Sequence, residues 1–112
     1  MARQAKPVDI LQGTLNMMIL RVLQQGPANG YEIAKYIEQR SDDLLQVEHG
    51  SLYPALRRLE AKALIKAEWR VSQTNRRARY YALTAAGKKQ VVVERSHWKT
   101  LVQAIARVMR PI

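Results

Sequence analysis

Ten side chains in three stretches of the sequence are of the types that bind a polyanion. Arginine donates two parallel hydrogen bonds to O6 and N7 of a guanine, and serine and tyrosine hydroxyls suit phosphate oxygens. These residue types at this spacing predict recognition of nucleic acid rather than bond-making chemistry. The candidates are Tyr31, Ser51, Tyr53, Pro54, Arg57, Arg58, Asn75, Arg76, Arg77 and Arg79.

Residues 51–58 are expected to contribute in different ways. Arg57 is the candidate base reader, and Ser51 and Tyr53 are expected to position the chain on phosphates. Arg58 lies one step round the predicted helix, toward the DNA backbone. Alternatively, Tyr53 packs over the hairpin that follows and both arginines only solvate one face of a helix. The basic segment 72–78 favours the binding interpretation.

The segment from Ser72 to Ala78 is polar and basic, and it has no apolar anchor in a core. Such a loop fits beside the phosphates or inserts an arginine into a narrow minor groove. The alternative is a solvated turn. Tyr31, at the start of a short predicted helix, fits either a phosphate contact or a place in the core.

The charge balance points to the same class of partner. The 112 residues include 19 Lys and Arg and 9 Asp and Glu, a formal net charge of +10. A concentrated positive field favours nucleic acid or an anionic membrane, and the alternative is a basic surface that serves solubility. Residues 71–112 hold one acid, Glu94, and the cations Arg76, Arg77, Arg79, Lys88, Lys89, Arg95, Lys99, Arg107 and Arg110.

Several other classes of function find no support in the sequence. The lack of cysteine excludes disulfides and thiolate chemistry, and His49 and His97 lack the spacing of metal ligands. No glycine-rich phosphate loop or nucleophile elbow is present, so we expect no enzyme, cofactor or metal site. The run from Met17 to Leu20 is too short for a signal or a membrane span. We therefore expect a cytoplasmic protein without stable membrane association.

Hydrophobic periodicity predicts the elements that position the candidates. Asp9 is expected to cap the first helix, Asn29 the second and Ser51 the third, with Pro54 in the first turn of that third helix. Thr84 caps the last helix. The predicted helices span residues 9–25, 29–40, 51–63 and 84–109, and the predicted strands span 65–71 and 79–83, with Ile65, Ala67, Trp69 and Val71 alternating toward the core.

Three helices followed by a hairpin are the order of a winged helix-turn-helix, a fold that is mainly α with a small β hairpin. In this fold the third helix enters the major groove of DNA, and the hairpin, called the wing below, lies beside it. The predicted organisation is a DNA-binding domain over residues 1–84 and a C-terminal dimerisation helix over residues 85–112.

The last helix has more apolar surface than a small core needs. An uncovered stripe in water is unfavourable, so a second copy is expected to cover it, unless the helix folds back onto its own domain. Trp98 fits either a dimer core or a platform that stacks on a small planar aromatic effector. The stripe residues expected at the dimer interface are Trp98, Leu101, Val102 and Ile105.

Four segments together resemble the PadR family of bacterial transcriptional regulators, most specifically the segment Gly-Ser-Leu-Tyr-Pro-Ala-Leu. They are Asp9 to Leu15, Gly30 to Ile33, His49 to Glu60 and Arg76 to Gly87. The chain resembles the short form with a single C-terminal helix, and the subgroup frequent in Acidobacteria. The resemblance implies a homodimer joined through the last helix and the first, where Leu11 and Leu15 lie. It also implies repression of nearby genes, and some family members release DNA when a planar ligand binds between subunits.

The sequence as a whole predicts a homodimeric repressor that binds an inverted-repeat operator in double-stranded DNA. The alternative is a winged-helix module that uses the same basic surface on RNA, an acidic protein or a membrane, without sequence-specific control of transcription. Salt dependence does not separate the two, because every polyanion releases counterions.

Overall fold

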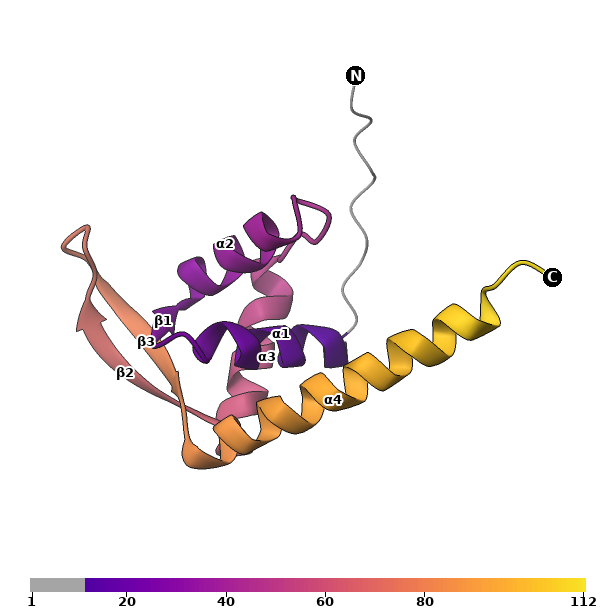
Figure 1. Cartoon of the computed structure of the whole chain (residues 1–112). Helices are drawn as coiled ribbons and strands as arrows, with labels where there is room; N and C mark the ends of the chain where they lie inside the picture. Colours follow the sequence, from indigo (N-terminus) through magenta and orange to yellow (C-terminus); the bar gives the residue numbers. More distant parts are fainter. Residues whose placement is uncertain (1–11) are drawn as a thin grey trace, which may run out of the picture.

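The structure, a computed structural model, describes residues 12–112. The expected Asp9 cap and the expected interface residue Leu11 lie outside the described residues. The predicted order of three helices, a hairpin and a last helix is confirmed, with one short extra strand (Figure 1). The elements are α1 (Gln12–Leu23), β1 (Ala28–Asn29), α2 (Gly30–Arg40), α3 (His49–Ala61), β2 (Ile65–Val71), β3 (Arg77–Leu83) and α4 (Ala85–Val108).

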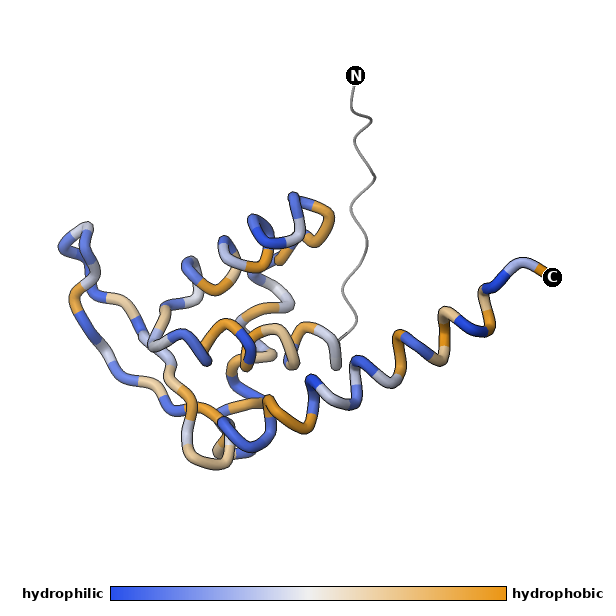
Figure 2. The backbone as a smooth tube through the Cα atoms, in the orientation of Figure 1, coloured by the Kyte–Doolittle hydropathy of each residue, from blue (hydrophilic) through white to orange (hydrophobic). Residues whose placement is uncertain are grey.

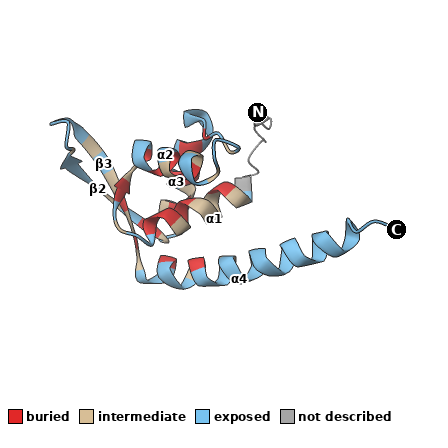
Figure 3. Cartoon of the chain, turned by 45° about the horizontal axis from the view of Figure 1, so that its top comes forward, coloured by how far each residue is buried: buried red, intermediate tan, exposed pale blue. Residues whose placement is uncertain are grey.

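The core lies where α1, α2 and α3 meet the sheet and the start of α4. Figure 3 shows buried residues on the facing sides of the three helices and exposed residues along most of α4. Each large aliphatic side chain buried in this way stabilises the fold by about 1.5–3 kcal/mol. The largest fully buried side chains are Ile19, Leu20, Ile33, Leu52, Leu56 and Val91.

The start of α2 is held by the predicted capping box. The Asn29 side chain accepts from the backbone N–H of Glu32 at 2.8 Å, and the Glu32 carboxylate accepts from the Asn29 N–H at 2.9 Å. Asn29 also belongs to β1, which pairs with β3 through Ala28 opposite Tyr81. The sheet is therefore three-stranded and antiparallel, in the order β1-β3-β2. A two-residue strand has no periodicity, so the sequence did not predict β1.

Helix α3 begins two residues earlier than expected. Its N-cap is Glu48, which makes no side-chain cap hydrogen bond, and the Ser51 N–H donates to the Glu48 carbonyl at 3.0 Å. Ser51 is therefore inside the first turn, and Pro54 lies beyond it, within the helix. The preceding residue Val47 is buried, and its N–H donates to the Glu38 carboxylate at 2.9 Å. This anchor sets where α3 begins and overrides the capping preference of serine.

The wing is longer and more exposed than expected. Strand β3 begins at Arg77 rather than Arg79, and β2 and β3 stay paired from Ile65 opposite Leu83 to Val71 opposite Arg77. Only the end next to the body of the molecule is buried, and the Trp69 side chain is 57% exposed. The prediction of a half-buried strand is wrong for the outer half of β2, because the two strands extend beyond the core (Figure 1).

Helix α4 starts in the core and then leaves it. The Thr84 hydroxyl caps it as predicted and accepts from the Gly87 N–H at 3.0 Å. Gly87 and Val91 are its buried residues, and every residue from Arg95 onward is exposed. Figure 2 shows apolar and polar positions alternating along this protruding part. None of the described helices is both long and apolar enough to cross a membrane.

Candidate DNA interface

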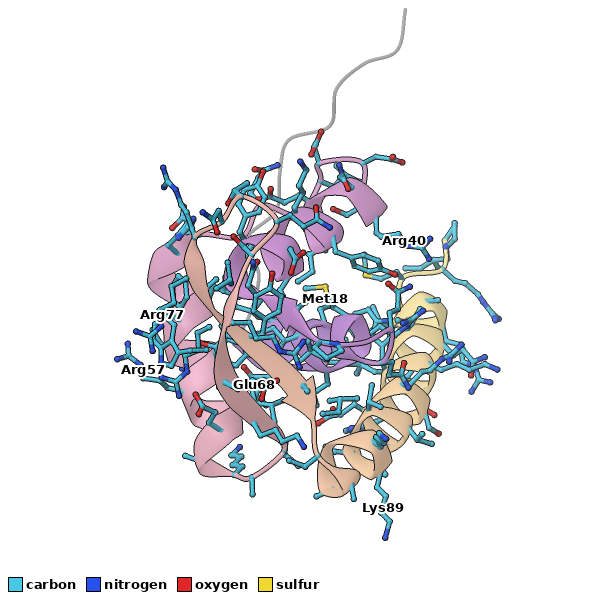
Figure 4. All side chains as sticks on the ribbon, turned by 90° about the vertical axis from the view of Figure 1, so that its left-hand side faces the viewer. Met18, Arg40, Arg57, Glu68, Arg77 and Lys89 are labelled. Atoms are coloured by element: carbon cyan, nitrogen blue, oxygen red, sulfur yellow. The ribbon has the colours of Figure 1, made fainter. Side chains whose placement is uncertain are left out.

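An open groove of about 530 Å³ lies between α3, the start of α2 and one face of the wing. It brings together five of the ten candidates, with at least one from each of the three stretches of sequence. Figure 4 shows Arg57 and Arg77 projecting on the same side of the molecule, one from α3 and the other from β3. The functional side chains along it are Tyr31, Tyr53, Arg57, Trp69, Arg77 and Arg79.

The two tyrosines lie at the α2 side of the groove. The Tyr53 ring packs over Gly30, so close that a Cβ at Gly30 would lie 2.8 Å from the Tyr53 hydroxyl oxygen. Tyr53 therefore packs against α2 rather than over the wing, and its side chain is still 40% exposed. Tyr31 is 64% exposed, with the Lys35 ammonium 3.4 Å from its hydroxyl. That exposure excludes the core alternative for Tyr31.

Arg57 and Arg58 are adjacent in sequence but lie in opposite environments. Arg57 is exposed, and it makes no hydrogen bond or ion pair with any described residue. Arg58 is half-buried and donates from Nη2 to the Asn16 side-chain oxygen in α1 at 3.4 Å, while its Nε is buried without a partner. One residue is a 100° rotation in a helix, so the Arg58 side chain is turned toward α1, which disfavours the predicted contact of Arg58 with DNA.

Arg79 links the wing to α3. Its guanidinium forms an ion pair with the Glu60 carboxylate at 2.9 Å. Arg79 lies within β3, in agreement with its place at the start of the predicted strand 79–83. The neighbouring Tyr81 is buried, and this burial raises the pKa of its phenol, while the charge of Arg79 lowers it. Arg79 therefore braces the groove rather than projecting from it as an unpaired cation.

The tip of the wing is a closed turn. Asn75 has a left-handed backbone with φ 59°, and its N–H donates to the Ser72 carbonyl at 2.9 Å. The Arg76 N–H reaches the Ser72 hydroxyl at 3.3 Å. Both residues are exposed, and the hydrogen bonds leave their side chains projecting from a fixed backbone. The turn can therefore present Arg76 to a phosphate without first becoming ordered.

Trp69 is the groove residue that sequence reasoning missed. The Arg77 guanidinium lies 5.1 Å from the centre of the Trp69 ring, across the two strands of the wing. Strand alternation assigned Trp69 to the core because it ignored where the core ends. A signal was present in the sequence: the polar run that starts at Ser72 follows Trp69 within three residues, too close for a core position.

The family model described as "Transcriptional regulator PadR-like family" matches residues 19–92, which include α2, α3 and the whole wing. The chain belongs to the PadR-like family. The match covers the groove and its bracing contacts and ends one residue after Val91, the last buried residue of α4.

Individual PadR-family and related proteins agree with this assignment. A transcriptional regulator from Clostridium thermocellum has 30% identity and a TM-score of 0.80, covering 88% of this chain and 96% of that one. A PadR family transcription regulator from Clostridium difficile R20291 has 30% identity and a TM-score of 0.75, covering 86% and 98%. The negative transcriptional regulator PadR of Bacillus subtilis is 27% identical over 69% of this chain, which spans only 42% of that regulator.

In this PadR-family chain, the apolar stripe of α4 lies uncovered. The Trp98 side chain is 43% exposed and that of Ile105 is 50% exposed, with Leu101 and Val102 between them in the same range. The outer part of α4 therefore does not fold back onto its own domain. Leu15, by contrast, is buried in the core of its own chain at 3% exposure. Its side chain leaves almost no surface for a partner.

Proposed function

We propose that this PadR-family transcriptional regulator is a homodimeric repressor that binds an inverted-repeat operator. The observation that carries the proposal is the groove itself: α3 and the wing present Arg57, Trp69 and Arg77 along one open surface. A groove flanked by cations on two elements suits a duplex, which offers base edges and phosphates at the same time. The Bacillus subtilis relative carries the description of a negative regulator, which favours repression over activation.

Helix α3 supplies the base contact in this proposal. Arg57 is an unpaired donor fork on the exposed face of α3, so it can bind guanine O6 and N7 in the major groove. The exposed hydroxyl of Ser51 and the Tyr53 hydroxyl, together with Tyr31 at the start of α2, contact phosphates. Pro54 is half-buried within α3 and has no N–H, so it lies beside these contacts without donating to a phosphate.

The wing supplies the backbone and minor-groove contacts. Arg76 and Asn75 at the tip lie beside phosphates, and Arg77 enters the minor groove from its place on the Trp69 ring. A guanidinium that is already stacked loses less side-chain freedom when it binds. Arg79 holds the wing at its angle to α3 through Glu60.

A second copy of the chain covers the apolar stripe of α4. Trp98, Leu101, Val102 and Ile105 recur at the spacing of one helix face and stay exposed in the single chain. In this division, residues 1–84 bind DNA and residues 85–112 join the two subunits. The two α3 helices would then read half-sites about one turn of DNA apart, roughly 34 Å.

Trp98 also borders a hollow between α4 and α1, which is lined by Met17 of α1 and Leu101 of α4. An indole edge beside apolar side chains suits a small planar aromatic effector. Ligand binding there, close to the proposed subunit contact, would change the spacing of the two α3 helices. Quenching of Trp98 fluorescence by planar aromatic acids, together with release of DNA, tests this extension.

The direct test is fluorescence anisotropy with the duplex upstream of the protein's own operon. We expect much tighter binding to that duplex than to random duplex of equal length, and we expect the preference to persist as salt rises. Equal affinity for both duplexes would contradict sequence-specific repression. It would favour the interaction-module alternative, which RNA and acidic peptides in the same assay would then identify.

A further inference from the structure

Helix α4 carries a row of cations that the proposed operator contacts do not use. Lys88, Arg95 and Lys99 are spaced by 7 and 4 residues, which places them on one side of α4, and Arg110 follows two residues after the helix ends. Lys89 and Arg107 are five helical turns apart and lie beside this row. From Lys88 to Arg107 the helix rises by about 29 Å. We call the six residues the α4 cation row: Lys88, Lys89, Arg95, Lys99, Arg107 and Arg110.

The α4 cation row has no ion-pair partner among the described residues of its own chain. All six side chains are exposed, and both ion pairs in the described part of the chain lie elsewhere, at Glu68–Arg70 and Glu60–Arg79. The one acid of α4, Glu94, accepts a hydrogen bond from the Gln90 amide at 3.0 Å on a different face of the helix. Five like charges are therefore held on one helix, and the sixth, at Arg110, follows its end.

A second copy of the chain cannot neutralise this row. Most carboxylates of the described residues already bind within their own chain: Glu32, Glu38, Glu60, Glu68 and Glu94. The described carboxylates outside this set are Asp42, Asp43 and Glu48, and a second copy brings its own net charge of +10, so a dimer has no negative excess to offer the row. The charge complement of the row must come from another molecule, and an extended polyanion fits its length.

The residues between the cations favour DNA over a membrane. They are Val92, Ser96, Gln103 and Ala106, while Trp98 and Val102 border the same hollow as Arg95 and Lys99 at the edge of the row. The large apolar residues of α4 lie in the neighbouring stripe, which the proposed dimer would cover. Duplex DNA carries one negative charge per about 1.7 Å of its axis, so a straight row of cations can contact several phosphates at once.

The α4 cation row does not face the groove. In Figure 4, Lys89 projects from the lower edge of the molecule beneath α4, whereas Arg57 and Arg77 project from the side formed by α3 and the wing. We propose that the α4 cation row binds the phosphate backbone of a second DNA duplex without reading its sequence. This function goes beyond operator binding, because it lets one protein bridge the operator and another DNA segment.

The experiment is a capture assay. The upstream duplex is immobilised, loaded with protein and washed, and then incubated with a labelled duplex of unrelated sequence. We compare the wild type with the variant Lys88→Gln/Lys99→Gln/Arg110→Gln, and with a control of equal charge loss outside both surfaces, Arg21→Gln/Lys62→Gln/Lys66→Gln. The wild type and the control should capture the second duplex. The α4 variant should lose most capture, and its slope of log K against log salt should fall by about 2.7.

Two further measurements on the same three proteins, operator affinity and binding to phospholipid vesicles, complete the test. Fluorescence anisotropy with the upstream duplex should give equal affinity for the wild type, the α4 variant and the control variant. Reduced affinity of the α4 variant alone would mean that the α4 cation row contacts the operator, and it would overturn the proposal. Equal capture by the α4 variant would overturn it too, as would binding to anionic phospholipid vesicles without capture of duplex. If the protein binds the upstream duplex no more tightly than random duplex, only the proposed repressor function fails. Capture of the second duplex is measured separately and still tests the α4 cation row.

Discussion

The arginines around the groove share one chemistry but differ in what their own chain already binds. Arg57 binds nothing, Arg77 is stacked on Trp69, Arg79 is paired with Glu60, and Arg58 is turned toward α1. Only a guanidinium with free donors can bind a base without first breaking a contact. At the scale of the residue, these surroundings support the proposal that Arg57 reads a base and that Arg79 braces the groove.

Arg57→Ala and Arg58→Ala should have opposite effects. Arg57→Ala should weaken operator binding by about 1–3 kcal/mol, with most of the loss at one base position and no change in Tm. Arg58→Ala should lower unfolding free energy by about 0.5–2 kcal/mol, because it removes packing and the contact with Asn16, and should leave operator affinity intact. Anisotropy on a set of single-base operator variants and urea denaturation measure the two effects. Equal losses of affinity would refute the assignment.

Trp69→Ala should weaken DNA binding although the residue contributes little to the core. The change removes the ring beneath the Arg77 guanidinium, and a stack of this kind contributes about 0.5–1 kcal/mol at an exposed site. Trp69→Phe should retain most of the binding. A double-mutant cycle with Arg77→Ala measures the coupling between the two side chains. Strictly additive losses would show that Trp69 acts independently of Arg77.

At the scale of the element, close contacts set how the wing and α4 are joined to the body. The wing is joined through the Arg79–Glu60 ion pair and through β1, which ties the start of α2 to β3. Helix α4 is joined at Gly87, where the backbone of Leu64 lies against the helix, and the Thr84 N–H donates to the Leu64 carbonyl at 3.1 Å. The wing therefore depends on the charge of Arg79, and α4 depends on the lack of a side chain at Gly87.

Gly87→Ala should destabilise the fold by about 3 kcal/mol or more. A Cβ at this position would overlap the Leu64 carbonyl oxygen, which is backbone and cannot rotate away. Gly13→Ala in α1 is the matched control, since no described residue lies within 4 Å of its Cβ position, and it should be neutral or stabilising by about 0.5–1 kcal/mol. Chemical denaturation followed by circular dichroism compares them. Similar midpoints for both variants would mean that α4 can shift away from Leu64.

At the scale of the whole molecule, the chain is elongated, with principal extents of 55, 38 and 22 Å. Helix α4 and the wing project from the body on different sides (Figure 1). The body between them holds the core, so neither projection is needed to complete it. The outer part of α4 is therefore free to bind a second copy through its apolar stripe and, as we propose, DNA through its cation row.

Ile105→Asp should convert the proposed dimer into a folded monomer. Ile105 is half exposed and contributes nothing to the core, so a charge there affects only a subunit contact. Val93→Asp is the control, because Val93 is exposed on α4 about 120° round the helix from Ile105. Light scattering coupled to size exclusion gives the mass of each variant. If the wild type is already a monomer at micromolar concentration, the dimer proposal is wrong.

The sequence by itself determined the features that depend on near neighbours in the chain. The caps at Asn29 and Thr84, the helix periods and the hairpin follow from contacts three or four residues apart or from strand alternation. Only the tertiary structure decided the features that depend on what lies across the fold. It turned Arg58 toward Asn16, paired β1 with β3, and placed Trp69 beyond the end of the core, in the groove between α3 and the wing. Local periodicity states which residues share a face, but the packing of distant elements determines whether that face meets the core, DNA or water.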